Sequence, residues 1–354
     1  MRLVLACLFL IASLAAPQAA IAAYDSVESG VTNLTFSSEF RSLLARHQVK
    51  IQTMAGATRR GGKIILPAKE GEVDPRAGKG TVESSGVVVF SAGARKVKLR
   101  QISFEAKHTP LIAKVGGGQL KIVTARKLTA KRAGFGASFT AVGLRLTAKA
   151  AQRLNKKLRL GSALSPAQIV GKLAVAVQPT TVHLAPAGRL SLALDATFSQ
   201  KLNCRFVSVN PIAPAELGGG PTLSFPVEPE STFAPDGSSG LVKLGGSVEL
   251  LQLGSAQYFW RQLQLEPAAA ALAAETDLEP SPPQPGRAPG APLFATQPGQ
   301  IASTAGSRMI EVTGQTALLP STTASAMNAA FAEGKPLFAA GEAVGTLSAL
   351  LTAE

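Results

Sequence analysis

Apolar and polar residues alternate along much of the chain, and one such stretch occurs twice. Residues 78–90 read GKGTVESSGVVVF, and residues 238–250 read SSGLVKLGGSVEL. Alternation with a period of two is typical of β-strands that cover a core with one face. At an offset of 160 residues the stretches share glycine and apolar positions: Gly80 and Gly240, Val82 and Val242, Gly86 and Gly246, Val88 and Val248, Phe90 and Leu250. The pattern predicts one strand-rich unit present twice.

Both copies then change phase in the same way. The apolar positions switch between odd and even numbers within one run: Val97 and Leu99 precede Ile102 and Phe104, while Tyr258 and Trp260 precede Leu263 and Leu265. One extra residue in a strand exchanges the faces that its side chains address. We therefore expect equivalent β-bulges at Gln101 and Gln262.

Each copy also contains a stripe of apolar residues at helical spacing. The stripes are Ala151, Leu154 and Leu158 in the first copy, and Ala324, Met327 and Phe331 in the second. Thr147 is a suitable N-cap for the first helix, and Pro320 followed by Ser321 is a suitable start for the second. A further helix is expected at residues 38–46, so the repeat extends over whole domains.

These elements predict a mainly β fold, with two tandem antiparallel β-sandwich-like domains that each carry two short helices. We expect the domains at residues 24–180 and 181–354. The first has a hairpin turn at Gly116 to Gly118, where the second has a Pro-rich loop at residues 279–292 that cannot sustain a regular element.

The N-terminus has the layout of a secretory signal peptide. Met1-Arg2 precede an apolar run at residues 3–16 and the small-residue site Ala20-Ile21-Ala22. We expect residues 1–23 to be removed and the mature chain to be extracytoplasmic, either secreted or associated with the cell surface. No later segment has the roughly 18 apolar residues of a membrane span. Cys204 is then the only cysteine, and we expect it to be buried and unreactive.

Charge divides the chain into two unlike halves. Residues 24–180 contain 27 Lys and Arg against 8 Asp and Glu, a balance of +19, whereas residues 181–354 contain 8 against 14, a balance of −6. Only the first half should attract polyanions. The candidate anion-binding residues lie on one face of a strand and on one helix: Lys96, Lys98, Arg100, Lys156, Lys157 and Arg159.

No catalytic constellation or metal site emerges from the sequence. Residues 77–81 read AGKGT, but Lys79 is followed by glycine and a strand instead of the Ser or Thr and helix of a phosphate-binding loop. The three histidines are scattered, and no second mature cysteine completes a zinc set. We therefore expect a non-enzymatic protein. Nucleic acid is not an expected partner, because the first half has no Trp and only Tyr24.

Residues 34–44, LTFSSEFRSLL, and residues 78–105 resemble the HtaA-type domain of bacterial envelope proteins, which has a Phe-Arg pair in its opening segment and a Gly-x-Gly-Thr-Val strand. Phe40-Arg41 and residues 78–82 match these motifs, and the internal repeat extends the resemblance to a divergent second copy. The resemblance implies haem binding and a role in iron uptake, with a helix tyrosine as iron ligand and a supporting histidine.

The sequence departs from this family at both ligand positions. The place of the tyrosine is taken by Leu43, and the expected histidine position reads Ser91-Ala92-Gly93-Ala94. Leucine and alanine offer iron no lone pair, so ligation by the family's route is lost. His47, one turn beyond Leu43, is a candidate to substitute for the missing ligand, and the candidate ligand-binding set is Phe40, Leu43 and His47.

Two functions remain open. One is an exported ligand-binding protein of the haem-binding type, with haem or another small molecule as its ligand. The other is a structural or adhesive wall-associated protein whose basic first domain binds anionic wall polymers or lipid headgroups.

Overall fold

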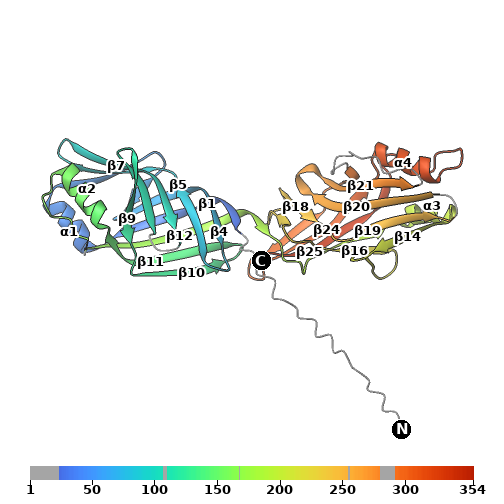
Figure 1. Cartoon of the computed structure of the whole chain (residues 1–354), viewed down its shortest axis with the longest axis horizontal. Helices are drawn as coiled ribbons and strands as arrows, with labels where there is room; N and C mark the ends of the chain where they lie inside the picture. The colour runs from blue at the N-terminus through green and yellow to red at the C-terminus, as the bar shows by residue number, and fades with distance from the viewer. Residues whose placement is uncertain (1–23, 107–109, 167, 254–255, 280–291) are drawn as a thin grey trace, which may run out of the picture.

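The computed structural model describes residues 24–106, 110–166, 168–253, 256–279 and 292–354. The expected signal peptide, and nearly all of the expected Pro-rich loop, lie outside these residues. The described chain is mainly β, as predicted, and forms two strand-rich bodies joined end to end (Figure 1).

The first body contains twelve strands and two helices in the described residues. In chain order these are β1 (Asp25–Phe36), α1 (Ser38–Arg46), β2 (Val49–Met54), β3 (Thr58–Arg60), β4 (Lys63–Asp74), β5 (Lys79–Ser84), β6 (Val87–Ala92), β7 (Arg95–Glu105), β8 (Leu111–Val115), β9 (Gly118–Thr124), β10 (Lys127–Ala133), β11 (Gly136–Leu146), α2 (Ala148–Leu158) and β12 (Ile169–His183).

The strands of this body pair antiparallel in a ring. The order is β12, β1, β4, β5, β7, β8, β9, β11 and back to β12, and the last link is a short pairing of β9 with β11. The remaining strands attach at its margins, with β2 joined to β6 and β6 to β7. Closing the ring in this way leaves few exposed strand edges.

The second body repeats this arrangement. Its elements are β13 (Arg189–Leu194), α3 (Ala196–Cys204), β14 (Val207–Ile212), β15 (Glu216–Leu217), β16 (Thr222–Pro226), β17 (Thr232–Phe233), β18 (Gly240–Lys243), β19 (Ser247–Gln252), β20 (Ala256–Glu266), the 3-10 turn η1 (Pro267–Ala269), β21 (Ala271–Glu279), β22 (Pro292–Thr296), β23 (Gln300–Thr304), β24 (Met309–Leu318), α4 (Ser321–Phe331) and β25 (Ala343–Thr352). Strands β16 and β17 together correspond to β4, and β20 corresponds to β7.

The glycines shared by the two stretches have the same role in both bodies. Gly80 and Gly240 have φ angles of 140° and 130°, and a Cβ on either would lie 2.7 Å from a backbone Cα of the neighbouring strand. Val82 and Val242, two residues further on, are both fully buried. The two stretches therefore form equivalent strands, β5 and β18.

The expected bulges are also present in both bodies. Gln101 and Gln262 have φ angles of 45° and 49°, in the left-handed region. Next to each of them the pairing register shifts, between β7 and β8 in the first body and between β20 and β21 in the second. The change of phase seen in the sequence thus marks the bulge, and it fixes which residues of β7 and β20 correspond.

Three of the four described helices lie where the sequence predicts them, and α3 (Ala196–Cys204) is the one that was not located in advance. Helix α1 spans Ser38–Arg46, and the Thr147 hydroxyl accepts a hydrogen bond from the Ala150 N–H at the start of α2. Pro320 is the N-cap of α4. Both predicted stripes are buried: Ala151, Leu154, Leu158, Ala324, Met327 and Phe331. Helix α3, which ends at Cys204, leaves that cysteine exposed, so the expectation of a buried Cys204 is wrong.

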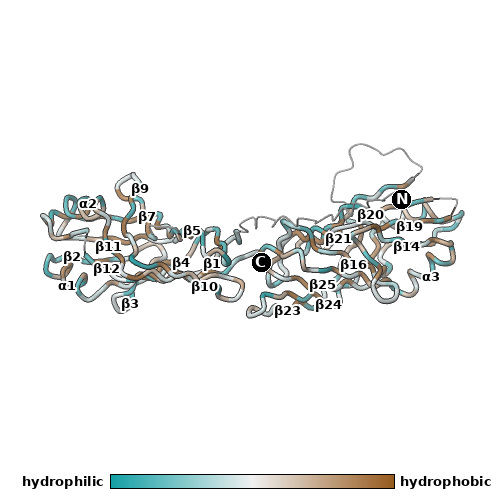
Figure 2. The backbone as a smooth tube through the Cα atoms, turned by 60° about the horizontal axis from the view of Figure 1, so that its bottom comes forward, coloured by the Kyte–Doolittle hydropathy of each residue, from teal (hydrophilic) through white to brown (hydrophobic). Residues whose placement is uncertain are grey.

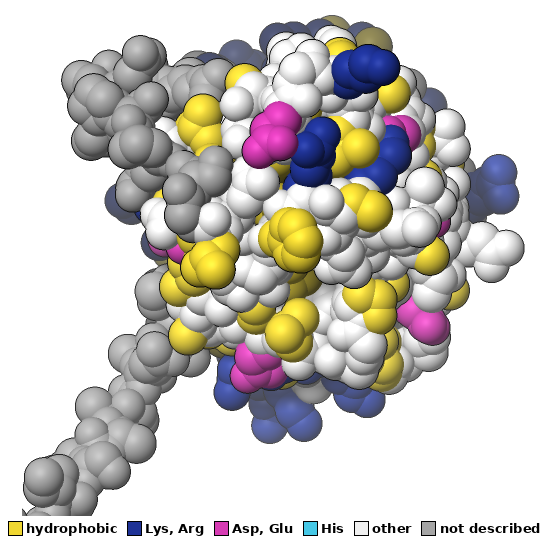
Figure 3. All heavy atoms as spheres, turned by 90° about the vertical axis from the view of Figure 1, so that its right-hand side faces the viewer, with side chains coloured by type: hydrophobic (Ala, Val, Ile, Leu, Met, Phe, Trp, Pro, Cys, Tyr) yellow, Lys and Arg dark blue, Asp and Glu magenta, His cyan; other side chains and the backbone are white. Residues whose placement is uncertain are grey.

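Two hydrophobic clusters fill the bodies. One takes its residues from positions 27–177, and the other from positions 182–353 together with Phe135 of the first half. Along the strands, hydrophobic and hydrophilic residues alternate, as the colouring of Figure 2 shows. Hydrophobic and charged side chains mix on the end face of the second body (Figure 3). No described helix is long and apolar enough to cross a membrane.

Candidate anion-binding site

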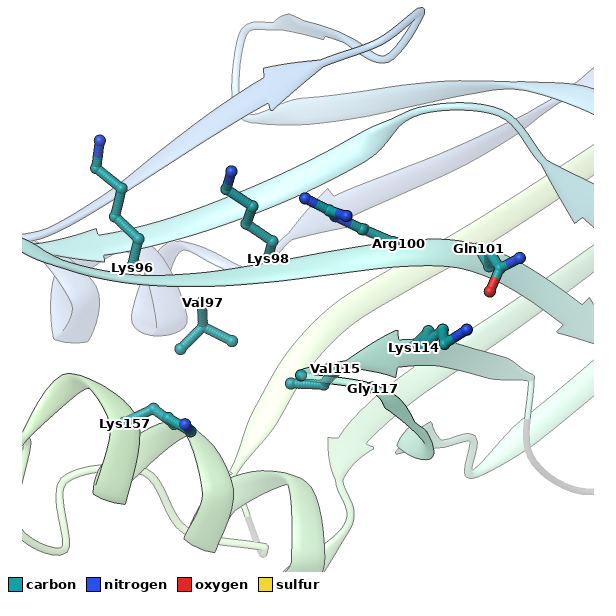
Figure 4. A pocket seen from close by; sticks show the side chains of 10 residues that line it. Lys96, Val97, Lys98, Arg100, Gln101, Lys114, Val115, Gly117 and Lys157 are labelled. Atoms are coloured by element: carbon teal, nitrogen blue, oxygen red, sulfur yellow. The ribbon is translucent and has the colours of Figure 1, made fainter.

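A groove of about 680 Å³ opens on the first body between β7, the turn that joins β8 to β9, and α2 (Figure 4). Five cationic side chains line it, together with small and apolar residues, and no Asp or Glu lines it. The lining residues are Lys96, Val97, Lys98, Arg100, Gln101, Lys114, Val115, Gly116, Gly117 and Lys157.

Alternation along β7 places three of the cations. Val97 and Leu99 are buried, so Lys96, Lys98 and Arg100 face the other side of the strand and are exposed. Figure 4 shows these three side chains projecting in one direction, with Val97 projecting in the other. The strand thus supplies a row of positive charge at spacings of about 6.6 Å.

The fourth cation comes from the neighbouring strand. In the register of β7 with β8, Arg100 lies directly opposite Lys114. Like charges in directly opposed positions destabilise a sheet, because their side chains lie close together. The fold therefore keeps an unfavourable pair at this place, and an anion bound there would relieve it.

Helix α2 forms the other wall and supplies the fifth cation. Its apolar stripe packs against the core, which leaves Lys157 exposed at the groove. The Arg153 Nη2 donates a hydrogen bond to the Val115 carbonyl oxygen at 2.7 Å, and so holds the helix against the end of β8.

None of the five cations forms an ion pair within the described residues. The described ion pairs of the first half are Lys69 with Glu70, and Asp25 with both His183 and Arg308. A concave surface that carries one sign of charge concentrates field lines and attracts counter-ions. The groove is therefore suited to an anionic ligand.

The predicted patch is only partly assembled at this groove. Lys96, Lys98, Arg100 and Lys157 line it, as the sequence analysis grouped them. Lys156 and Arg159 are exposed on α2 or at its C-terminal end but do not line the groove, and Arg159 takes the left-handed conformation at the helix C-cap.

Sequence reasoning missed Lys114 and Gln101. Lys114 is brought to Arg100 by the pairing of β7 with β8, which the local pattern does not state. For Gln101 the signal was available, because the change of phase that predicts the bulge also predicts a disturbed strand, and bulges are frequent next to functional sites.

The residues proposed for haem lie elsewhere, on α1 and its end. Phe40 is buried in the first core, where its ring packs 5.5 Å from the ring of Phe36. Leu43 is half-buried against the same core, and His47 is exposed at the C-cap of α1. Among the described residues, no group of three or more His, Cys, Asp and Glu side chains could hold a metal ion.

The chain is similar in structure to HtaA domains. Solved structures of the C-terminal and N-terminal domains of HtaA from Corynebacterium glutamicum match it at 13% identity, with TM-scores of 0.36 and 0.30. Each match covers 43% of this chain and 98% of the solved HtaA domain. Neither a scan against protein-family models nor a search of curated proteins finds a match. With TM-scores this low, the similarity to HtaA says nothing about a ligand.

The second body provides an internal comparison for the groove. Aligned through the two bulges, Lys96, Lys98 and Arg100 correspond to Gln257, Phe259 and Arg261. Arg261 pairs with Asp277 at 3.1 Å, and its guanidinium lies 4.5 Å from the centre of the Phe259 ring. Glu275 lies opposite Arg261 in the second body, at the position that corresponds to Lys114 opposite Arg100 in the first. The repeat thus neutralises in one copy the charge that it exposes in the other.

Proposed function

We propose that this chain is an exported, non-enzymatic binding protein of the cell envelope, and that its first domain binds an anionic ligand in the groove between β7 and α2. The observation that carries the proposal is that five cationic residues, without an ion pair in the described residues, line one groove. The neutralised copy of this site in the second domain supports the same function, because a cationic groove is not a requirement of the fold.

The export part of the proposal rests on the first 23 residues. If they are a signal peptide, the protein recovered outside the cytoplasm begins near Ala23 or Tyr24. N-terminal sequencing of protein from the cell-surface and medium fractions tests this. Intact protein that begins at Met1 in the cytoplasm would contradict it.

Anionic polymers and lipid headgroups of the envelope are the first class of ligand that we propose. The groove is lined by cations and contains no aromatic side chain on which a base could stack. Attraction of this kind is screened over about 8 Å at physiological ionic strength, so binding should weaken as salt is added.

Replacement of groove cations tests this function directly. We expect the variant Lys96→Gln/Lys98→Gln/Lys157→Gln to bind a phosphate-rich probe, such as inorganic polyphosphate, roughly tenfold more weakly than the parent and with a smaller salt dependence. The matched control is Lys127→Gln/Lys131→Gln/Lys172→Gln, which removes the same charge from exposed strand positions outside the groove. Equal losses in both variants would show that only net charge matters, and would refute the site.

Haem is the second candidate, favoured by the size and charge of the groove. A volume of about 680 Å³ lies within the range of small-molecule sites, and the cations could pair with the two haem carboxylates. The groove lining contains no His, Cys or Tyr to ligate iron, so we propose no iron ligand there. Titration of the protein with haem tests this: a Soret shift that the triple groove variant abolishes supports haem, and an unchanged spectrum at stoichiometric haem removes it.

A further inference from the structure

One edge of β7 is open where it borders the groove. Residues Arg95–Lys98 pair with β6 on one side, from Ser91 opposite Lys96 to Val89 opposite Lys98. On the other side, β8 pairs with Leu99 and Arg100 and then ends at Val115, and the chain turns away through Gly116 and Gly117. In the described part of the chain, no strand pairs with this edge of residues 95–98.

The open edge carries unused backbone groups. In an antiparallel strand, alternate residues direct both their N–H and their C=O to the same side. Two of the four residues from 95 to 98 therefore direct these groups away from β6, toward the groove. An unpaired edge of this kind is a template on which another extended segment can add as a strand.

The second body shows which segment fills the equivalent edge. There β21 continues past the point at which β8 ends, and its last residues pair with β20: Thr276 with Trp260, Asp277 with Phe259, Leu278 with Tyr258 and Glu279 with Gln257. Through the aligned bulges, the last three of these positions on β20 correspond to Lys98, Val97 and Lys96. The groove of the first body therefore lies where the second body has its own strand.

The residues of this added strand have a simple pattern, acidic, apolar, acidic. Leu278 packs against the second core, and Asp277 pairs with Arg261. In the first body, the strand positions opposite Lys98 and Lys96 would place acidic side chains on the face that carries these two cations. The position between them would address Val97, whose side chain projects toward α2 (Figure 4). Charge and shape thus favour the same kind of occupant.

We propose that the groove binds an extended acidic peptide segment, of acidic–apolar–acidic pattern, as an antiparallel strand added to the open edge of β7. The partner is a protein of the envelope that presents such a segment. This inference rests on the proposed anion-binding function, and it adds a protein ligand to the two ligand classes proposed there. Main-chain hydrogen bonds to β7 supply affinity, and Lys96 and Lys98 select for acidic residues on either side of the apolar one.

The probe is a synthetic peptide with the sequence of residues 274–279 of this chain, AETDLE, carrying a fluorophore. We expect it to bind the full chain saturably, and to bind Lys96→Glu/Lys98→Glu at least tenfold more weakly. The control Lys127→Glu/Lys172→Glu changes the net charge equally on exposed strands outside the groove, and it should bind like the parent. A peptide of the same composition with its acidic residues made adjacent should bind more weakly than AETDLE.

Methylation of the peptide backbone separates strand addition from simple charge attraction. Two peptides are compared, one methylated on the nitrogens of its first, third and fifth residues and one on those of the other three. Since alternate N–H groups face β7 in a strand, one of the two should lose binding and the other should retain it. Equal affinity of both methylated peptides for the protein would overturn strand addition.

The outcomes also separate the inference from the function on which it rests. Polyphosphate that binds the groove while AETDLE does not would overturn the peptide assignment and leave the anion-binding function standing. If neither probe distinguishes the groove variants from their controls, both proposals fall. Binding of AETDLE with the pattern of sensitivities given above supports both.

Discussion

Phe206 is held in a backbone conformation that side chains seldom adopt. It follows α3 with a φ of 54°, and its side chain is 84% exposed. Val207, the next residue, begins β14 and lies opposite Gln252. The equivalent residue after α1 is Gln48, with a φ of 53°. The turn after the helix thus imposes the left-handed conformation in both copies.

Replacing Phe206 by glycine should relieve this backbone strain and make the protein more stable. Phe206→Gly should raise the free energy of unfolding by about 0.5–1 kcal/mol, because glycine adopts positive φ without steric cost and little buried surface is lost. Urea denaturation of the variant and the parent measures the difference. Gln48→Gly is the matched control in the other copy and should show a gain of similar size. A loss of stability in Phe206→Gly would mean that the exposed ring contributes to the fold.

Strand β7 shows which features of the groove the local sequence pattern could predict and which it could not. Alternation predicted the exposed face with Lys96, Lys98 and Arg100, and the phase change predicted the bulge, because both depend only on neighbours in sequence. The groove depends on where β8 ends and on its register, which places Lys114 opposite Arg100. A local pattern does not contain such long-range pairings, and for the same reason the sequence analysis placed Lys156 and Arg159 in one patch with the cations of β7, although they do not line the groove.

The close pairing of β17 with β18 predicts that a side chain at Gly240 destabilises the second body. Gly240 in β18 has a φ of 130°, and a Cβ there would lie 2.7 Å from the Phe233 Cα. Gly240→Ala should therefore destabilise the second body by about 1–3 kcal/mol, since the strand cannot relax without breaking its pairing. Thermal unfolding followed by circular dichroism measures the loss.

A second glycine is the control for this substitution. Gly306 has no heavy atom within 4 Å of its Cβ position, so Gly306→Ala should change the stability by less than about 0.5 kcal/mol. Equal effects of Gly240→Ala and Gly306→Ala would contradict the steric argument.

The two bodies are joined by a strand that belongs to both. β12 pairs with β1 in the first body, and its last residues, Val182 and His183, pair with β17 of the second. The sequence analysis expects domains at residues 24–180 and 181–354, and β12 runs across the boundary between them to His183. Phe135 of the first half also packs in the second core. Sequence pattern could show the repeat, and it could not show how its copies share elements.

A buried ion pair reinforces this junction. Arg308 of the second body donates hydrogen bonds to the carbonyl oxygens of Gly134 and Phe135, and its Nη2 lies 3.6 Å from the Asp25 carboxylate. Both charged side chains are at most 6% exposed. Removal of one charge from such a pair leaves the other without compensation, so Arg308→Ala should cost about 3–5 kcal/mol of unfolding free energy.

A double-mutant cycle tests whether the loss of stability in Arg308→Ala comes from the buried Asp25 charge that it leaves without a partner. Asp25→Ala/Arg308→Ala should be less destabilised than the sum of the two single variants, since the double variant leaves neither Asp25 nor Arg308 buried without the other. Arg189→Ala, which breaks an exposed pair with Glu216, should cost less than about 1 kcal/mol and serves as the surface control. Strict additivity in the cycle would show that Arg308 and Asp25 act independently.

His183 makes the junction sensitive to pH. Its ring Nδ1 lies 3.4 Å from the Asp25 carboxylate, and this contact, with the charge of Glu354, raises the His183 pKa above its ordinary value, against the opposing effect of burial. Arg308 is the other charged group at this carboxylate.

A group whose pKa is raised by folding stabilises the folded state fully at pH values below its unfolded pKa, near 6.5 for His. This stabilisation is lost as the pH rises through the folded-state pKa. The difference in stability between the parent and His183→Gln should therefore be largest below about pH 6 and shrink as the pH rises through the raised pKa of His183, with a size of about 1 kcal/mol or less, because the ring is partly exposed. The backbone N–H of residue 183, which also donates to Asp25, is retained in the variant, so the comparison isolates the ring. Melting temperatures measured across this range test the sign: a difference that grows toward alkaline pH would mean that the neutral ring is the form that holds the two bodies together.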